Sequence, residues 1–271
     1  MILVTGGTGL VGSHLLYFLL KENQQVRVLH RANSDLQRVK KVLGYYTDDA
    51  QSYFNRIQWV RADITDLPAL SEAFEGVTHV YHCAAFISFD PKDYNQLKKI
   101  NVEGTAHIVN LCLHYKIEKL CYLSSIATLG STADGSFITE DSPWNAESKN
   151  SVYALTKYSA EMEVWRGIQE GLNAVILQPS VILGEGFWAS GAGVLLKIAE
   201  KQIPYYTTGE IGVVDVKDVV RAMILSMKSD LQNTHKILSA KNISYKDLMS
   251  DLAGHLDKKP PHRPIDSWKL Y

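Results

Sequence analysis

The sequence predicts a doubly wound α/β protein, in which helices cover both faces of a parallel sheet. Two observations carry this prediction: short, almost unbroken apolar runs alternate with longer segments of helical periodicity, and a glycine-rich turn follows the first apolar run. Strands buried on both faces read as continuous apolar runs. Right-handed crossovers between such strands give a doubly wound sheet.

The elements of the first two thirds of the chain follow this alternation. Six strands are predicted, at Ile2–Thr5, Gln25–Leu29, Ile57–Val60, His79–His82, Lys119–Leu123 and Ala174–Leu177. Helices are predicted at Leu10–Lys21, near Leu36–Leu43, and at Ala69–Phe74, Pro91–Tyr115 and Ser151–Gln169. We therefore assign residues 1–178 to one sheet-based domain.

The pattern changes after Pro179. Four glycines occur between Gly184 and Gly193, and two prolines follow each other at 260–261. A helix after Val216 and a strand near Lys236–Leu238 look like further elements of the main sheet. We expect residues 179–271 to form a smaller, discontinuous part, with residues 211–238 returning to the core.

Composition excludes several classes of protein. With 46% hydrophobic and 21% charged residues the chain is not disordered, and a formal net charge of −1 predicts no general affinity for nucleic acid or anionic membranes. No apolar stretch reaches the roughly 18 residues of a membrane span. The first residues read as a strand and not as a signal peptide, and the three cysteines form no CxxC pair, so we expect reduced thiols and a cytoplasmic location.

No metal site is predicted. His79 and His82 lie three residues apart in a strand, so their side chains point to opposite faces of the sheet. The remaining histidines, cysteines and paired carboxylates show no set of ligand spacings that closes a site.

The glycine-rich turn at residues 5–12, TGGTGLVG, has the position of a phosphate-binding loop between a strand and a helix. Glycine allows the backbone to approach a diphosphate, and the first-turn N–H groups of the helix face its charge. A plain glycine-rich turn is the alternative. The predicted dinucleotide contacts here are Gly6, Gly9, Leu10, Val11 and Gly12.

The end of the second strand indicates which dinucleotide is bound. A carboxylate there would accept hydrogen bonds from the 2′-hydroxyl of NAD(H), whereas an arginine suits the 2′-phosphate of NADP(H). Arg31 follows the strand, and the next acid is Asp35. NADP(H) is therefore the preferred dinucleotide. NAD(H) is the alternative, and in that case Arg31 is only a solvated surface charge.

The motif YxxxK occurs four times, at Tyr17/Lys21, Tyr94/Lys98, Tyr115/Lys119 and Tyr153/Lys157. The spacing alone places both side chains on one helix face and selects none of them. Only Tyr153 starts a helix after the fifth strand, whose end carries Ser124 and Ser125. Ligands of an open parallel sheet bind beyond these carboxyl ends.

At this point the chain resembles an extended short-chain dehydrogenase/reductase of the NAD(P)-dependent epimerase/dehydratase superfamily, and most of all its dihydroflavonol reductase-like branch. The resembling segments are Thr5–Gly12, Val60–Asp66, His82–Ala85, Asn101–Thr105, Leu123–Gly130, Tyr153–Glu161 and Gln178–Gly184. The resemblance implies a Rossmann fold and an NAD(P)-dependent enzyme.

The resemblance also implies roles for matching residues. Tyr153 matches the general acid/base, Lys157 its lysine partner, and Ser125 the serine that binds the substrate oxygen, with Ser124 as the near alternative. Further cofactor contacts are implied at Asp63, Ile64, Ala84, Ala85, Lys157 and Pro179. Asn101 matches a family asparagine that we treat as structural.

These residue types suit hydride-transfer chemistry. A phenol with a pKa near ~10 is a poor base at neutral pH. A lysine ammonium one helical turn away, with oxidised nicotinamide nearby, should lower the pKa of Tyr153, and Ser125 should steady the charge that develops on oxygen.

The substrate is a small molecule whose class is only weakly indicated. No arginine lies between Arg166 and Arg221, whereas aromatic residues occur at Trp144, Phe187, Trp188, Tyr205 and Tyr206. This favours an NADP(H)-dependent reductase of a small or apolar carbonyl compound (or an alcohol dehydrogenase). A sugar-nucleotide epimerase or dehydratase with tightly bound cofactor, and a non-catalytic dinucleotide sensor, are the alternatives.

The resemblance also implies a homodimer through the helices at Pro91–Tyr115 and Ser151–Gln169. We expect Ile108, Leu111 and Trp165 to face the partner.

Overall fold

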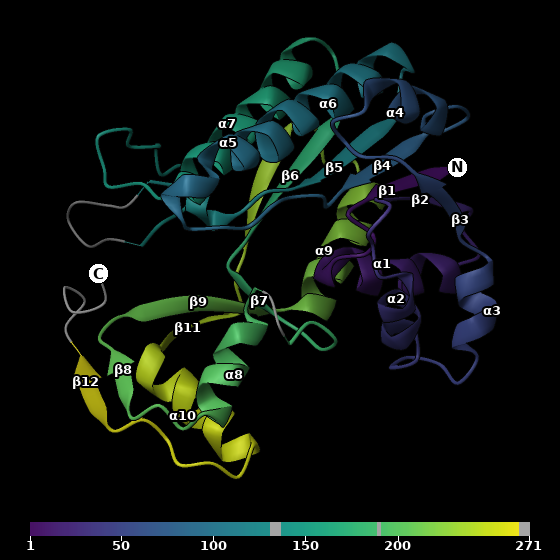
Figure 1. Cartoon of the computed structure of the whole chain (residues 1–271). Coiled ribbons are helices and arrows are strands. Elements are labelled where there is room, and N and C mark those ends of the chain that lie inside the picture. Colours follow the sequence, from purple (N-terminus) through teal and green to yellow (C-terminus); the bar gives the residue numbers. More distant parts are fainter. Residues whose placement is uncertain (131–136, 189–190, 266–271) are drawn as a thin grey trace.

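The computed structural model describes residues 1–130, 137–188 and 191–265, and it confirms the predicted fold class (Figure 1). A seven-stranded sheet has the order β10-β6-β5-β4-β1-β2-β3, and all of its neighbouring strands are parallel. Its strands are β1 (Ile2–Thr5), β2 (Val26–His30), β3 (Gln58–Arg61), β4 (His79–His82), β5 (Lys119–Leu123), β6 (Ala174–Pro179) and β10 (Thr234–Leu238). The strand order reverses between β1 and β4, which places a ligand crevice beside β1.

Helices cover both faces of this sheet because successive strand residues point to opposite sides. Leu3 of β1 belongs to the apolar core under α4 (Leu67–Ala73), α6 (Gly104–His114) and α7 (Val152–Gln169). Val4, its neighbour, belongs to the core under α1 (Leu10–Lys21), α2 (Leu36–Leu43) and α9 (Val216–Lys228).

Two regions differ from the sequence prediction. The short helix α3 (Ala50–Asn55) was not predicted, because six residues are too few to show a periodic pattern. The single helix expected at Pro91–Tyr115 is divided into a 3₁₀ turn at Pro91–Asp93, α5 (Tyr94–Leu97), a π-helical turn at Lys98–Glu103 and α6. Buried Asn101 lies in the π turn and bonds the backbone of Phe86, which gives this irregular turn a tertiary partner.

The residues proposed for the dimer face need correction. Ile108 is fully buried and Leu111 almost so, and both pack into the core of their own protomer. Their side chains therefore face the sheet and not a partner.

The remaining elements form a smaller part beyond the main sheet (Figure 1). Its strands are β7 (Val181–Leu183), β9 (Glu210–Asp215) and β11 (Lys241–Ser244) in one sheet, and β8 (Tyr205–Thr207) with β12 (Arg263–Ile265) in another. Helices α8 (Gly193–Glu200) and α10 (Tyr245–His255) pack on each other through a small apolar cluster. From this region α9 returns to pack on α1, and β10 pairs with β6. The division into domains at residue 178 stays a prediction.

Among the described residues, no helix has both the length and the apolar character needed to cross a membrane. Within the same residues, no group of three or more histidine, cysteine, aspartate or glutamate side chains is arranged to hold a metal ion.

Candidate active site

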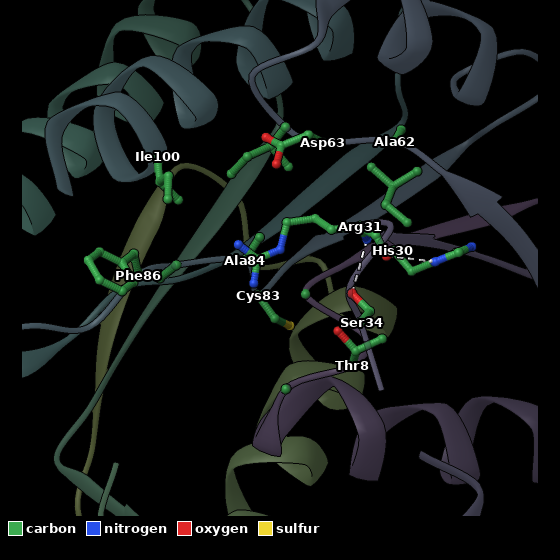
Figure 2. A pocket seen from close by; sticks show the side chains of 15 residues that line it. Thr8, His30, Arg31, Ser34, Ala62, Asp63, Cys83, Ala84, Phe86 and Ile100 are labelled. Carbon is green, nitrogen blue, oxygen red and sulfur yellow. Dashed lines mark hydrogen bonds between the residues drawn. The ribbon is translucent and has the colours of Figure 1, made fainter. Parts of the chain in front are cut away.

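A groove runs along the carboxyl ends of the central strands, where the order of the sheet reverses (Figure 2). Seven of the predicted cofactor residues line it, namely Gly6, Gly9, Arg31, Asp63, Ile64, Ala84 and Ala85. The structure adds residues that the sequence did not single out, namely Thr8, Leu29, His30, Ser34, Ala62, Cys83, Phe86 and Ile100. Leu29, His30, Ala62 and Cys83 lie at strand ends or directly after them, whereas Thr8 lies in the glycine turn and Ile100 in the π-helical turn.

The glycine turn fits a diphosphate for reasons visible in its backbone. Gly6 has a φ of +68°, and a Cβ there would lie 2.6 Å from the amide nitrogen of Ala84. Helix α1 begins after Gly9 without a side-chain cap, so the amides of its first turn, including those of Leu10 and Val11, are left for a ligand. The loop therefore has the shape and the donors that a dinucleotide diphosphate needs.

Replacing Gly12 by alanine is expected to destabilise the protein by about 1–3 kcal/mol and to weaken dinucleotide binding. A Cβ at this position would lie 2.3 Å from the carbonyl oxygen of Gly6, and backbone atoms cannot move aside cheaply. Thermal unfolding measures the loss. Gly254→Ala in α10 is the control, because a Cβ there meets nothing within 4 Å and should leave stability equal or slightly higher. Equal melting temperatures for the two variants would contradict this account.

The far end of the groove holds the residues expected at the adenosine. Arg31 is exposed, and its backbone N–H donates to Ser34 Oγ at 3.0 Å. Asp63 Oδ1 accepts from the backbone N–H and the hydroxyl of Thr65, at 2.9 and 2.8 Å. The carboxylate is thus held at the rim of the groove. Arg31 also borders an adjoining hollow that Arg61 lines.

The two serines that follow β5 have different partners in the folded chain. Ser124 is buried and donates to Glu161 Oε2 at 2.6 Å, so its hydroxyl is already used within the core. Ser125 caps a short 3₁₀ turn, and its Oγ accepts from the backbone N–H of Ala127 at 3.2 Å. Its side chain is close enough to the Tyr153 hydroxyl to lower the pKa of that phenol. Of the two alternatives, Ser125 is the one that the structure brings to the tyrosine.

Tyr153 and Lys157 lie one turn apart near the start of α7, but their hydroxyl and ammonium groups make separate contacts. Lys157 is buried, and its Nζ donates to the Tyr122 hydroxyl at 2.8 Å and to the Leu123 carbonyl at 3.0 Å. Burial lowers the pKa of Lys157 to about 8. Its ammonium acts electrostatically on Cys83, which lines the groove.

Lys157 by itself does not lower the pKa of Tyr153. Burial raises the pKa of Tyr153 to about 12, and the neighbouring Ser125 side chain opposes this only in part. Lys157 makes its hydrogen bonds to Tyr122 and Leu123.

The other three YxxxK motifs lie away from this cluster. Tyr17 is buried in an aromatic stack with Tyr46 and Tyr53. Tyr94 is exposed on α5. Tyr115 ends α6 while Lys119 lies in β5, so that pair does not share a helix face.

Two further groups of predicted residues lie outside the lining of the groove. Pro179, expected at the nicotinamide, pairs with Leu238 at the end of β6 and is not among the residues that line the groove. Two of the five aromatic residues expected around the substrate pack against other side chains of the protein. Phe187 is buried under Arg38, and Trp144 stacks on Tyr158 at 4.4 Å.

An apolar loop after β4 lies against Tyr153. Phe89 is 67% exposed, and its ring packs edge-on against Tyr153 with centroids 5.6 Å apart. Ile87 beside it is also exposed. Asn101 bonds both the N–H and the carbonyl of Phe86, at 2.8 and 3.0 Å, and so fixes the start of this loop. The run AFISF at residues 85–89 was the available signal for these contacts.

Comparison with known proteins shows the family of the chain. The sequence pattern of the NAD dependent epimerase/dehydratase family matches residues 2–238. The "Putative dihydroflavonol 4-reductase" of Synechocystis sp. is 29% identical over 98% of this chain and 75% of its own length. Tetraketide alpha-pyrone reductase 2 of Arabidopsis thaliana is 26% identical over 98% of this chain and 84% of its own length.

Solved structures show the same fold. The crystal structure of gox2253 superposes with a TM-score of 0.86 and 30% identity, covering 100% of this chain and 79% of that one. The UDP-glucose 4-epimerase of Thermus thermophilus in complex with NAD has a TM-score of 0.80 at 23% identity, covering 98% and 86%.

The fold and the groove define an NAD(P)-dependent enzyme of the oxidoreductase or epimerase/dehydratase class. The chain belongs to the NAD dependent epimerase/dehydratase family, the extended short-chain dehydrogenases/reductases.

Proposed function

We propose that this protein is an NADP(H)-dependent reductase of a small or apolar carbonyl compound, or oxidises the corresponding alcohol. The observation that carries the proposal is the placement of the Ser125–Tyr153 pair beside an exposed apolar loop. A polar pair that can serve a carbonyl oxygen thus lies next to a wall that suits an apolar substrate body.

The proposed roles follow from these contacts. Bound NADPH supplies the hydride that reaches the carbonyl carbon. Tyr153 donates its hydroxyl proton to the carbonyl oxygen as negative charge develops there, and Ser125 donates a hydrogen bond to the same oxygen. Lys157 is buried and acts electrostatically on Cys83, which lines the groove, and its ammonium would hold the ribose hydroxyls of the bound cofactor.

The proposed cofactor contacts are those that the sequence predicts. The first turn of α1, with Gly6, Gly9, Leu10, Val11 and Gly12, would hold the diphosphate, and the rim residues Asp63, Ile64, Ala84 and Ala85 would flank the adenosine. Pro179 would neighbour the nicotinamide. Leu10, Val11, Gly12, Lys157 and Pro179 do not line the groove and are proposed on the family resemblance.

Arg31→Ala is expected to weaken NADPH binding about tenfold or more while leaving NADH binding almost unchanged. A guanidinium gains a charged hydrogen bond from a 2′-phosphate and little from a bare hydroxyl. Fluorescence titration with each reduced cofactor measures both affinities without any substrate. Arg221→Ala serves as the control, because this arginine lies on α9 with its side chain exposed. Equal affinity of the unaltered protein for NADPH and NADH would contradict the proposed preference.

A turnover assay on a panel of aromatic and aliphatic carbonyl compounds tests the reaction itself. Consumption of freely exchanging NADPH supports the reductase. Cofactor that stays bound through purification, together with conversion of a nucleotide sugar, would instead support the epimerase or dehydratase. The diphosphate of such substrates is usually bound by arginine side chains. The homodimer and the cytoplasmic location stay predictions, and sedimentation at micromolar concentration tests the first of them.

A further inference from the structure

Glu161 is a buried acid for which the proposed reaction has so far no role. Its carboxylate is 4% exposed and lies one helical turn beyond Lys157 on α7. Oε2 accepts from Ser124 at 2.6 Å and lies 2.8 Å from the Thr128 hydroxyl. Both of its oxygens also lie near the amide nitrogen of Gln178, at 3.1 and 3.2 Å.

Ser124 and Gln178 offer hydrogen-bond donors to the carboxylate, whereas the single hydroxyl hydrogen of Thr128 serves either Glu161 or the Ser125 carbonyl, each 2.8 Å away. The indole N–H of Trp165 adds a longer hydrogen bond to Oε1, at 3.4 Å. These partners come from the end of β5, from β6 and from α7, so one buried side chain ties three elements together.

These contacts hold the turn that carries Ser125. Ser124 precedes it and Thr128 ends the same 3₁₀ turn, so Glu161 holds the turn on both sides of Ser125. The Thr128 hydroxyl also lies 2.8 Å from the Ser125 carbonyl. With this turn fixed, the Ser125 hydroxyl faces Tyr153.

Glu161 also raises the pKa of the buried Lys157. Burial is the main cause that lowers the pKa of Lys157, and Glu161 is the largest effect opposing it. From β4 and the residue after it, His82 and Cys83 also face the lysine. Burial lowers the pKa of His82 to about 3 and raises that of Cys83 to about 12, so both are neutral at pH 7.

The phenols around the lysine are neutral as well. Tyr122 of β5 accepts a hydrogen bond from Lys157, and burial raises its pKa well above the usual value, as it raises that of Tyr153 on α7. Among the described groups that face Lys157, Glu161 is thus the one carboxyl group, and it raises the pKa of the lysine.

We propose that Glu161 is a positioning residue, whose buried carboxylate fixes the Ser124–Thr128 turn so that Ser125 meets Tyr153, and keeps Lys157 in its ammonium form. The proposal rests on the proposed function for its meaning in catalysis. Its two halves make separate predictions, one for charge and one for geometry.

The charge is tested without any substrate. Lysine labelled with ¹³C at Cε is titrated by NMR, and the Lys157 signal is assigned by its loss in Lys157→Met. In Glu161→Gln the pKa of Lys157 should fall by about one unit, because a nearby opposite charge has been removed. Glu161→Asp should keep the wild-type value. The control Glu163→Gln removes a surface partner of Arg166 on the same helix and should change nothing. An unchanged lysine pKa in Glu161→Gln would overturn the electrostatic role, whether or not any carbonyl substrate is found.

The geometry is tested with an active carbonyl substrate. Activity should fall as pH rises through the pKa of Lys157, and Glu161→Gln should move this alkaline limb to lower pH by about the same one unit. Glu161→Asp keeps the charge but is shorter, so kcat should drop about tenfold with the limb in place. If Glu161→Gln loses kcat but the alkaline limb of its pH profile does not move, the electrostatic role of Glu161 is overturned and only a packing role is left.

Thr128→Val provides a second variant in case Glu161→Gln does not fold. It removes one hydroxyl from the turn while the carboxylate stays. We expect a drop in kcat/KM of several fold at an unchanged alkaline limb, and wild-type turnover would overturn the positioning role.

Discussion

Replacing Tyr153 by phenylalanine is expected to cut turnover by about 10² or more while fold and cofactor affinity persist. The change removes one hydroxyl, which is the proposed proton donor and the partner of Ser125. The phenyl ring keeps its edge-on packing with Phe89. Steady-state kinetics on an active carbonyl compound measure the loss, and fluorescence titration with NADPH shows whether the groove is intact.

The other three YxxxK tyrosines are matched controls for this experiment. Tyr17→Phe and Tyr94→Phe should leave turnover nearly unchanged. Tyr115→Phe removes a hydroxyl that donates to the Ser71 carbonyl at 3.0 Å, so it should cost about 1 kcal/mol of stability and no activity. If one of these variants loses turnover while Tyr153→Phe stays active, the wrong motif has been chosen.

Lys157→Met is expected to lower turnover by about 10² or more and to weaken NADPH binding as well. Methionine fills nearly the same buried volume, so the protein should still fold, but the groove loses the ammonium proposed to hold the ribose. The Tyr122 hydroxyl and the Leu123 carbonyl lose their shared donor. The paired loss of rate and affinity distinguishes this variant from Tyr153→Phe, for which affinity persists.

Lys98→Met is the control for the lysine, since Lys98 belongs to the exposed Tyr94 motif. It should keep both turnover and affinity. Unchanged NADPH affinity in Lys157→Met would rule out the proposed contact with the ribose, and unchanged turnover would rule out its role in catalysis.

Sequence patterns predicted the regular part of the fold closely, because burial on both faces of a parallel sheet leaves a continuous apolar signal. β1, β4, β5 and α1 have their predicted bounds, and β2 and β3 are shifted by one residue. The glycine turn could also be predicted from the sequence. A Cβ at Gly6 or Gly12 would collide with backbone atoms, so glycine is required at both positions. The choice of Tyr153 among four motifs depended on the order of elements and on the family resemblance, and its role still awaits the kinetic test.

What the sequence by itself determined is therefore the fold class and the family, and it predicted seven of the residues that line the groove. Only the tertiary structure separated Ser125 from Ser124, because their hydroxyls differ in the partners that α7 brings to them. The structure also placed Ile108 and Leu111 inside the core and brought Phe89 to Tyr153. Contacts between residues tens of positions apart leave no local periodicity in the chain, and pKa values depend on the burial that such contacts create. For this reason the buried Glu161 and its four hydrogen-bond partners could be found only in the folded molecule.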